Sequence, residues 1–541
     1  LNSRNTNAGD LTITNSGNLI STGTSSTGLI AQSIGGGGGN IRRLGQEQLA
    51  NNLVLGAEGL VNGSGGAISL RNTGALIQTE ADYARAMLVQ SIGGGGGWVA
   101  GNVSSGTISQ LGAKESSGTL SAGDLTITNG ADIITSGLSA AGITAQSIGG
   151  GGGVIGNRAG SISMGMLDST GLASGGSLDL TNTGSISTSG NGAAGLVAQS
   201  IGGGGGLANQ IYGDLELGLD GAGGSVRANG GDVSVTNRGA AIVTRGEGSP
   251  ALVSQSIGGG GGYLGSQQTR NRGGRLGSGA YERNQLTEVP IPQLGSDYTL
   301  NSGAVDLTNR AEIRTIGSTS PGVIAQSVAG GGGVTGLILD GILTNGMNGP
   351  ARASAGDVSV DNSGQVITNG IGSSALLAQS IGGGGGFSSA DSNDELFLGA
   401  LYAQLAEAGD VVVTNSGNLQ TSGEGSIGLL AQSIGGGGGA NAYVTPDISL
   451  GSSDRLFLSS YFSDEGNAGD LTITNTSALI RTNANSSPGM LIQSVAGGGG
   501  WSALTGETTA NARLGSRGGT NAQAGDLNVS NSADVVTVGR D

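Results

Sequence analysis

One string of residues, Gln-Ser-(Ile/Val)-(Gly/Ala)-Gly-Gly-Gly-Gly, recurs nine times along the chain. Self-similarity of this kind is the signature of a repeat architecture, in which each unit packs mainly on its neighbours. The repeat therefore constrains the fold more than any single segment does. The glutamines of the nine copies are Gln32, Gln90, Gln146, Gln199, Gln255, Gln326, Gln379, Gln432 and Gln493.

A second marker, Gly-Asp-Leu-Thr-Ile-Thr-Asn at residues 9–15, precedes the first glutamine and has an equivalent before each of the others. Each asparagine lies 17 or 18 residues before its glutamine, whereas the distance from a glutamine to the next asparagine ranges from 36 to 54 residues. Stacked coils with loop insertions on one side would give this alternation of fixed and variable segments. The marker ends on Asn15, Asn72, Asn129, Asn182, Asn237, Asn309, Asn362, Asn415, Asn475 and, without a following glutamine, Asn531.

The two markers divide the chain into repeats of one continuous solenoid over residues 1–541. The chain begins without a signal segment and its last repeat is cut short, so we expect a mature piece or a fragment of something longer. No apolar run is long enough to span a bilayer. The repeats cover approximately residues 9–65, 66–122, 123–175, 176–230, 231–302, 303–355, 356–408, 409–468, 469–524 and, in part, 525–541.

The fixed segment has the period of β-strands. Leu11 and Ile13 would face one way and Thr12 and Thr14 the other. In most copies an Asn-x-Gly turn signal follows, and then a second short apolar segment. A third segment, residues 29–34, has neighbouring apolar residues and is expected to be buried on both faces.

Short strands joined by Gly and Asn turns, repeated about every 53–60 residues, predict an all-β fold. We expect a right-handed parallel β-helix, or β-solenoid, in which each coil pairs with the next. Strand-like pieces also occur in the variable segments. We therefore expect two or three coils per repeat and a rod on the order of 100 Å long.

Composition narrows the class of function. The 22 basic residues are outnumbered by 38 acidic ones, for a net charge of −16, so nucleic acid is not an expected partner. The chain has no Cys and no His, which removes thiol chemistry and the commonest catalytic base. No carboxylate pair or nucleophile recurs beside a base, so we predict that the chain is not an enzyme and uses no cofactor.

The glycine runs, such as residues 35–39, could be flexible linkers or phosphate-binding loops. Their fixed position after the same strand favours ordered glycine, required where one backbone lies against another. No run has the Gly-Lys-(Ser/Thr) ending of a phosphate loop. We therefore predict that the glycines are close-packed.

The repeated asparagines and glutamines are the candidate site residues, with a structural role. Asn15 and its equivalents share the parity of Leu11 and Ile13, so their amides should point inward and pair from coil to coil. Gln32 and its equivalents are predicted to form a second ladder or to cap backbone groups near the glycines. Neither amide can act as a base, and no catalytic, cofactor or metal residue is assigned.

Two charged features have less specific readings. Aspartates in the marker suggest a calcium-binding site, but they recur too seldom along the chain for a calcium β-roll, and a turn-forming role explains them better. They are Asp10, Asp124, Asp232, Asp357, Asp410, Asp470 and Asp526. The longest insertion holds arginines and prolines that form either a solvated loop or a contact for an acidic partner; they are Arg270, Arg272, Arg275, Arg283, Pro290 and Pro292.

The marker at residues 9–17 and the segment at residues 28–39 resemble the passenger regions of large bacterial autotransporter-type surface proteins. The resemblance extends along the whole chain. The resemblance implies a β-helical rod that is exported through an outer-membrane barrel. Such a rod serves as an adhesin or a cell-surface fibre.

We therefore expect a structural or adhesive fibre that is extracellular, either on the bacterial surface or in a biofilm matrix. The expected partners are other copies of the chain, joined end to end or laterally, and surface glycans or host surfaces. A β-helical glycan-active enzyme and a ligand-specific adhesin are the alternatives. Thr12 with Thr14 and Thr126 with Thr128 also suggest ice or mineral binding, although most copies break that pattern.

Overall fold

A computed structural model describes most of the chain, and the regular structure in the described residues is entirely β-strand. The described residues are 5–42, 54–56, 58–59, 62–103, 109–158, 162–209, 215–219, 225–268, 274–278, 298–339, 342–348, 351–389, 395–401, 403, 405–442, 455–458, 465–477, 479–503, 511–516 and 521–539.

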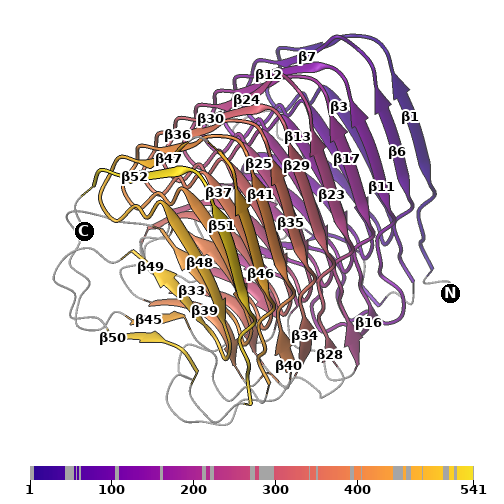
Figure 1. Cartoon of the computed structure of the whole chain (residues 1–541). Helices are drawn as coiled ribbons and strands as arrows, with labels where there is room; N and C mark the ends of the chain where they lie inside the picture. Colours follow the sequence, from indigo (N-terminus) through magenta and orange to yellow (C-terminus); the bar gives the residue numbers. More distant parts are fainter. Residues whose placement is uncertain are drawn as a thin grey trace.

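The strands stack in long parallel sheets around one axis (Figure 1). We number the sheets I to VI in the order in which one turn of the chain visits them. Every pair of neighbouring strands is parallel and comes from successive repeats, as in the pairing of Leu125 with Leu178. The predicted parallel β-helix is confirmed.

Sheets I, II and III are formed by the fixed segment of each repeat. Sheet I contains β1 (Leu11–Asn15), β6 (Ile68–Asn72), β11 (Leu125–Asn129), β17 (Leu178–Asn182), β23 (Val233–Asn237), β29 (Val305–Asn309), β35 (Val358–Asn362), β41 (Val411–Asn415), β46 (Leu471–Asn475) and β51 (Leu527–Asn531). Sheet II contains β2 (Leu19–Ser21), β7 (Leu76–Thr79), β12 (Asp132–Thr135), β18 (Ile186–Thr188), β24 (Ala241–Thr244), β30 (Glu312–Thr315), β36 (Val366–Thr368), β42 (Leu419–Thr421), β47 (Leu479–Thr482) and β52 (Asp534–Thr537). Sheet III contains β3 (Leu29–Ile34), β8 (Met87–Ile92), β13 (Ile143–Ile148), β19 (Leu196–Ile201), β25 (Leu252–Ile257), β31 (Val323–Val328), β37 (Leu376–Ile381), β43 (Leu429–Ile434) and β48 (Met490–Val495).

Sheets IV, V and VI follow in the glycine run and the variable segment. Sheet IV contains β4 (Gly38–Arg42), β9 (Gly96–Val103), β14 (Gly152–Arg158), β20 (Gly205–Ala208), β26 (Gly261–Gln268), β32 (Gly332–Leu339), β38 (Gly385–Ser388), β44 (Gly438–Asn441) and β49 (Gly499–Ser502). Sheet V contains β5 (Val54–Leu55), β10 (Ser109–Leu111), β15 (Ile162–Met164), β21 (Leu215–Leu217), β27 (Gly274–Ser278), β33 (Ile342–Asn348), β39 (Glu395–Leu401), β45 (Arg455–Leu458) and β50 (Asn511–Leu514). Sheet VI contains β16 (Gly171–Leu172), β22 (Val226–Arg227), β28 (Tyr298–Thr299), β34 (Arg352–Ser354) and β40 (Leu405–Glu407).

Each repeat forms one large coil, so the expectation of two or three coils per repeat is wrong. The strands of the variable segment do not stack on strands of their own repeat. They pair instead with the equivalent strands of the repeats before and after, as β15 does with β10 and β21. Ten stacked strands at the usual separation give a height of roughly 45 Å, less than half of the expected length.

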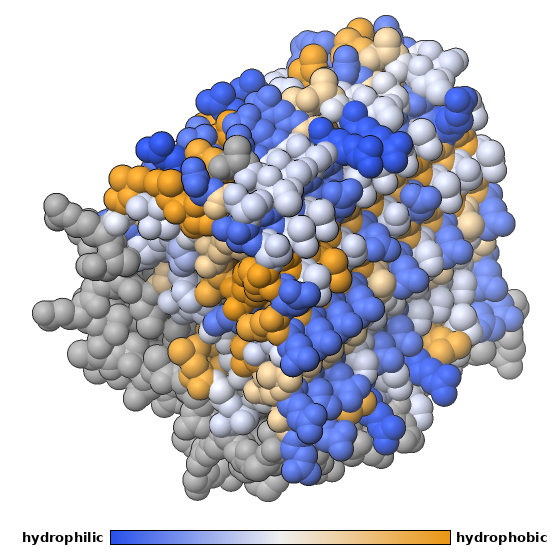
Figure 2. Space-filling view, in the orientation of Figure 1, coloured by the Kyte–Doolittle hydropathy of each residue, from blue (hydrophilic) through white to orange (hydrophobic). Residues whose placement is uncertain are grey.

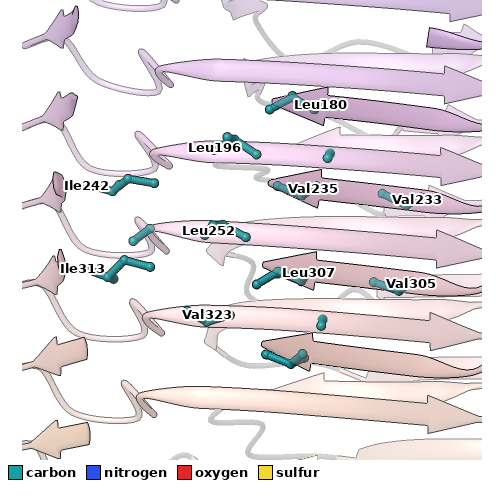
Figure 3. Packing of buried hydrophobic residues seen from close by; sticks show 14 of the residues in the cluster. Leu180, Leu196, Val233, Val235, Ile242, Leu252, Val305, Leu307, Ile313 and Val323 are labelled. Atoms are coloured by element: carbon teal, nitrogen blue, oxygen red, sulfur yellow. The ribbon is translucent and has the colours of Figure 1, made fainter. Parts of the chain in front are cut away.

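The core is divided into layers by sheet III. One face of sheet III packs against sheets I and II, where identical positions of successive coils form columns of Leu, Ile and Val (Figure 3). The other face packs against sheet IV, where Leu88 meets Trp98 in a second cluster. All six residues of β8 are buried, which confirms that this strand has no solvent face.

A third apolar layer lies between sheets IV and V and includes Val99, Leu111 and Met164. Aromatic side chains are few in the core; Trp98, Tyr263 and Phe387 lie between sheets III and IV, whereas Tyr298 lies in a separate cluster with Leu300. The described part of the chain contains no helix that could span a bilayer.

Candidate functional site

The asparagine ladder runs the whole length of sheet I. Each asparagine ends its strand, and from Asn72 to Asn475 the side chains are fully buried. Each Nδ2 donates to the Oδ1 of the asparagine in the next coil at 2.7–2.9 Å, so that all the bonds point the same way along the stack. The donor–acceptor series is Asn15, Asn72, Asn129, Asn182, Asn237, Asn309, Asn362, Asn415, Asn475 and Asn531.

The same amides also close the turn between sheets I and II. The Nδ2 of Asn182 donates to the carbonyl of Gly184, two residues on, at 2.8 Å, and Asn362 bonds Gly364 in the same way at 2.9 Å. Both amide hydrogens are therefore used, one between coils and one within a coil. A buried amide satisfied in this way avoids the cost of an unpaired polar group.

The glutamine ladder lies between sheets III and IV. Gln146 Nε2 donates to Gln199 Oε1 at 2.8 Å and lies 3.4 Å from the carbonyl oxygen of Gly153 in the glycine run. Equivalent bonds of 2.6–2.8 Å join every successive pair. The series is Gln32, Gln90, Gln146, Gln199, Gln255, Gln326, Gln379, Gln432 and Gln493.

A third connection uses the serine that follows each glutamine, which sequence reasoning did not single out. Ser200 Oγ donates to the carbonyl of Gly176 at 2.7 Å and accepts the backbone N–H of Gly231, in the next coil, at 2.8 Å. Its constant place in the repeated string was the available signal. The nine serines that bridge coils in this way are Ser33, Ser91, Ser147, Ser200, Ser256, Ser327, Ser380, Ser433 and Ser494.

The glycine runs are ordered and begin sheet IV. Gly153 has a φ of +135°, a conformation open essentially to glycine alone. A Cβ added there would lie 1.9 Å from the carbonyl oxygen of Gly97 in the preceding coil. The prediction of close-packed glycine is confirmed, and both the linker and the phosphate-loop readings are set aside.

The marker aspartates line the edge of sheet I and bond the backbone of the next coil. Asp10 Oδ1 accepts the N–H of Ala67 at 2.8 Å, and Asp124 Oδ1 accepts that of Ser177 at 2.8 Å. Toward the C-terminal end the carboxylates of Asp357, Asp410 and Asp470 accept the backbone N–H of the marker aspartate in the next coil, the last donor being Asp526. No group of three or more carboxylates that could hold a metal ion occurs within the described ranges.

Hydrogen bonds, charge and burial shift the pKa of several described side chains. Hydrogen bonds from the backbone N–H and the hydroxyl of Ser185 lower the pKa of Asp132. Glu115 and Glu58 raise the pKa of Lys114, which lies 3.3 Å and 3.4 Å from their carboxylate oxygens on the surface. Burial raises the pKa of Tyr263, whose hydroxyl donates to the carbonyl of Gly248.

The outer face of sheet I is mostly polar, with Val412 as an exposed aliphatic residue in β41. In Figure 2, rows of pale and blue side chains follow one another across the coils of this face. One outward position carries threonine in seven of its ten copies, so that parallel register places the hydroxyls in a column. The column is Thr14, Arg71, Thr128, Thr181, Thr236, Thr308, Asp361, Thr414, Thr474 and Ser530.

Most of the predicted arginine-rich insertion lies outside the described residues. Arg275 is in β27 of sheet V, whereas Arg270, Arg272, Arg283, Pro290 and Pro292 belong to segments that the structure does not describe. Comparison with models of protein families, with curated proteins and with solved structures finds no match for the chain.

Proposed function

We propose that the chain is a structural or adhesive rod of an extracellular fibre, on a bacterial surface or in a biofilm matrix. The observation that carries this proposal is how the recurrent polar side chains are used. Asparagine, glutamine and serine in successive coils bond one another or the adjacent backbone. The recurrent polar residues of each repeat are thus used to join it to its neighbours, as expected of an extended structural rod.

The adhesive part of the proposal rests on the outer face of sheet I. Hydroxyl groups repeat there at the strand separation of about 4.8 Å, on a face whose exposed aliphatic side chain in the middle coils is Val412. Many weak hydrogen bonds made at once give useful avidity toward a repeating ligand. Surface glycans, which are repeating and rich in hydroxyl groups, are therefore the partner that this face suits best, with other copies of the chain as partners for lateral or end-to-end assembly.

A binding assay on insoluble polysaccharide tests the adhesive function. In one variant Thr236→Lys and Thr308→Lys place long charged side chains on the outer face of sheet I. The matched control, Ser187→Lys with Gln420→Lys, changes the outward side of sheet II. Loss of retention in the first variant alone supports adhesion through sheet I. Equal retention by both variants and the unmodified chain contradicts it.

Electron cryomicroscopy of the isolated material tests the structural function. Rods whose coils continue in register from one copy to the next support a fibre. Separate particles that also release sugar from a polysaccharide would instead favour the glycan-active enzyme.

A further inference from the structure

Exposed arginines gather on one part of the outer surface of sheet II. They belong to two successive coils, those of β24 and β30, which lie side by side in Figure 1. Two of them lie in the turn between sheets I and II, one lies on the outer face of β30, and one directly follows β24. We call this group the arginine patch; it consists of Arg238, Arg245, Arg310 and Arg314, which are all exposed.

Strand register brings the four arginines into one small area. The backbone N–H of Arg310 donates to the carbonyl oxygen of the residue before Arg238 at 2.9 Å, so the two turn arginines are stacked in adjacent coils. Burial alternates along β30, and Arg314 points outward. Arg314 pairs with Val243, which lies two residues before Arg245. In the coils on either side, the equivalent positions carry no charged residue.

The positive charge of the arginine patch has no partner in an ion pair. Among the described residues, ion pairs involve only Lys114 with its neighbouring glutamates, and Arg245 Nη1 donates instead to the hydroxyl of Ser187 at 2.9 Å. Glu247 and Glu312 are exposed on the same surface, whereas the described aspartates of these two coils lie in or directly before strands of sheet I. Four positive charges thus accompany two negative ones, on a chain whose net charge is −16.

Aliphatic side chains lie among the arginines. Ile316 has the place of Arg245 in the next coil and is 40% exposed, and Ile371, one coil further on, is 38% exposed. Ile367 pairs with Arg314 and is half-buried. Such side chains can pack against the C–H groups of a sugar ring, because that contact removes apolar surface from water. Guanidinium groups bind carboxylates, and glutamate oxygens accept hydrogen bonds from hydroxyl groups.

We propose that the arginine patch binds an acidic polysaccharide, of the class that carries carboxylates on its sugar rings. A duplex nucleic acid is disfavoured because its phosphates are dense, about one per 1.7 Å of helix axis, and would be repelled by Glu247 and Glu312. A uronate polysaccharide has at most one charge per sugar, and its hydroxyl groups are donors for the two glutamates. The patch is separate from the outer face of sheet I, so the inference does not depend on adhesion through that face.

Biolayer interferometry with immobilised polygalacturonate tests the arginine patch, and fully methyl-esterified polygalacturonate is the uncharged ligand. The unmodified chain should bind the acid form more tightly, and added NaCl should weaken binding because it screens exposed charges. Arg310→Gln with Arg314→Gln should weaken binding to the acid form by about 5- to 30-fold. The matched control, Arg227→Gln with Arg352→Gln, removes the same charge from exposed positions of sheet VI and should leave binding unchanged.

Three results would overturn the proposal. The first is no tighter binding of the acid form than of the methyl-esterified form by the unmodified chain, a comparison that needs no variant. The second is equal weakening by the two pairs of substitutions, because binding would then follow net charge and not the arginine patch. The third is duplex DNA or phosphatidylglycerol vesicles bound as tightly as polygalacturonate and weakened equally by Arg310→Gln with Arg314→Gln.

Discussion

The contact between glycine runs of successive coils gives the sharpest test of how the solenoid is held together. Gly386 in β38 has a φ of +137°, and a Cβ there would lie 1.9 Å from the carbonyl oxygen of Gly333. Gly372, in the same coil, also has a positive φ, of +62°, but an added Cβ would meet nothing closer than 3.5 Å. Gly386→Ala and Gly372→Ala are therefore a matched pair.

The two substitutions should differ in cost. Gly372 corresponds to Thr319 in the preceding coil, which has a φ of +51°, so Gly372→Ala should destabilise by only about 1–2 kcal/mol. Gly386→Ala requires a conformation that costs about 1–3 kcal/mol and in addition overpacks the coil contact, which typically costs another 1–3 kcal/mol. We therefore expect a loss of roughly 2–6 kcal/mol for Gly386→Ala.

Urea unfolding followed by circular dichroism measures both losses, and hydrogen exchange locates them. Protection should fall at the backbone amides of β32 and β38 in Gly386→Ala, while Gly372→Ala should keep the pattern of the unmodified chain. Equal losses for the two variants, or no loss for Gly386→Ala, would refute the argument that backbone contact fixes these glycines.

Three further predictions concern the interior. Asn182→Ala removes one link of the asparagine ladder and leaves buried groups of Asn129 and Asn237 unpaired, so urea unfolding should show a loss of about 2–4 kcal/mol. Ser200→Ala leaves the carbonyl of Gly176 and the N–H of Gly231 without their partner, and urea unfolding should show a loss of about 1–3 kcal/mol. A loss below measurement error for Asn182→Ala or Ser200→Ala would argue that the corresponding contact between coils does not stabilise the fold. Arg85, just before β8, is buried, and the hydrogen bond printed for its guanidinium is to Thr144 Oγ1, so Arg85→Ala should raise stability in urea unfolding, by no more than on the order of 5 kcal/mol. Because burial lowers the pKa of Arg85 to about 9, its penalty is fully present below pH 9, and the gain of the variant should shrink as the pH rises above that value.

Much of the fold could be predicted because the apolar residues of the fixed segment have a clear period of two. Leu11 and Ile13 predicted sheet I, and the apolar pairs of residues 29–34 predicted a strand covered on both faces. The number of coils per repeat could not be predicted in the same way. Sheet IV begins with glycines, which carry no hydrophobic pattern, and the strands of sheets V and VI are as short as Gly171–Leu172.

The interior polar contacts were less accessible to sequence reasoning. Parity placed Asn15 and Gln32 inside, where parallel register brings each amide against its equivalent in the next coil. Ser33 has the same constant position, but a serine bonds backbone groups whose location depends on how the coils stack. The burial of Arg85 left no signal at all, since the same residue type is exposed at Arg71 and Arg238.

The asparagine ladder has a consequence for how such a gene can change. Every asparagine presents the same acceptor to the coil before it and the same donor to the coil after it. Removal of residues 123–175 would bring Asn72 against Asn182, with the glutamine and serine contacts meeting equivalent partners. Unequal recombination between repeats can therefore shorten or lengthen the protein by whole coils, each about 4.8 Å high. The new contact between coils would have the same hydrogen-bonding partners as the contacts it replaces.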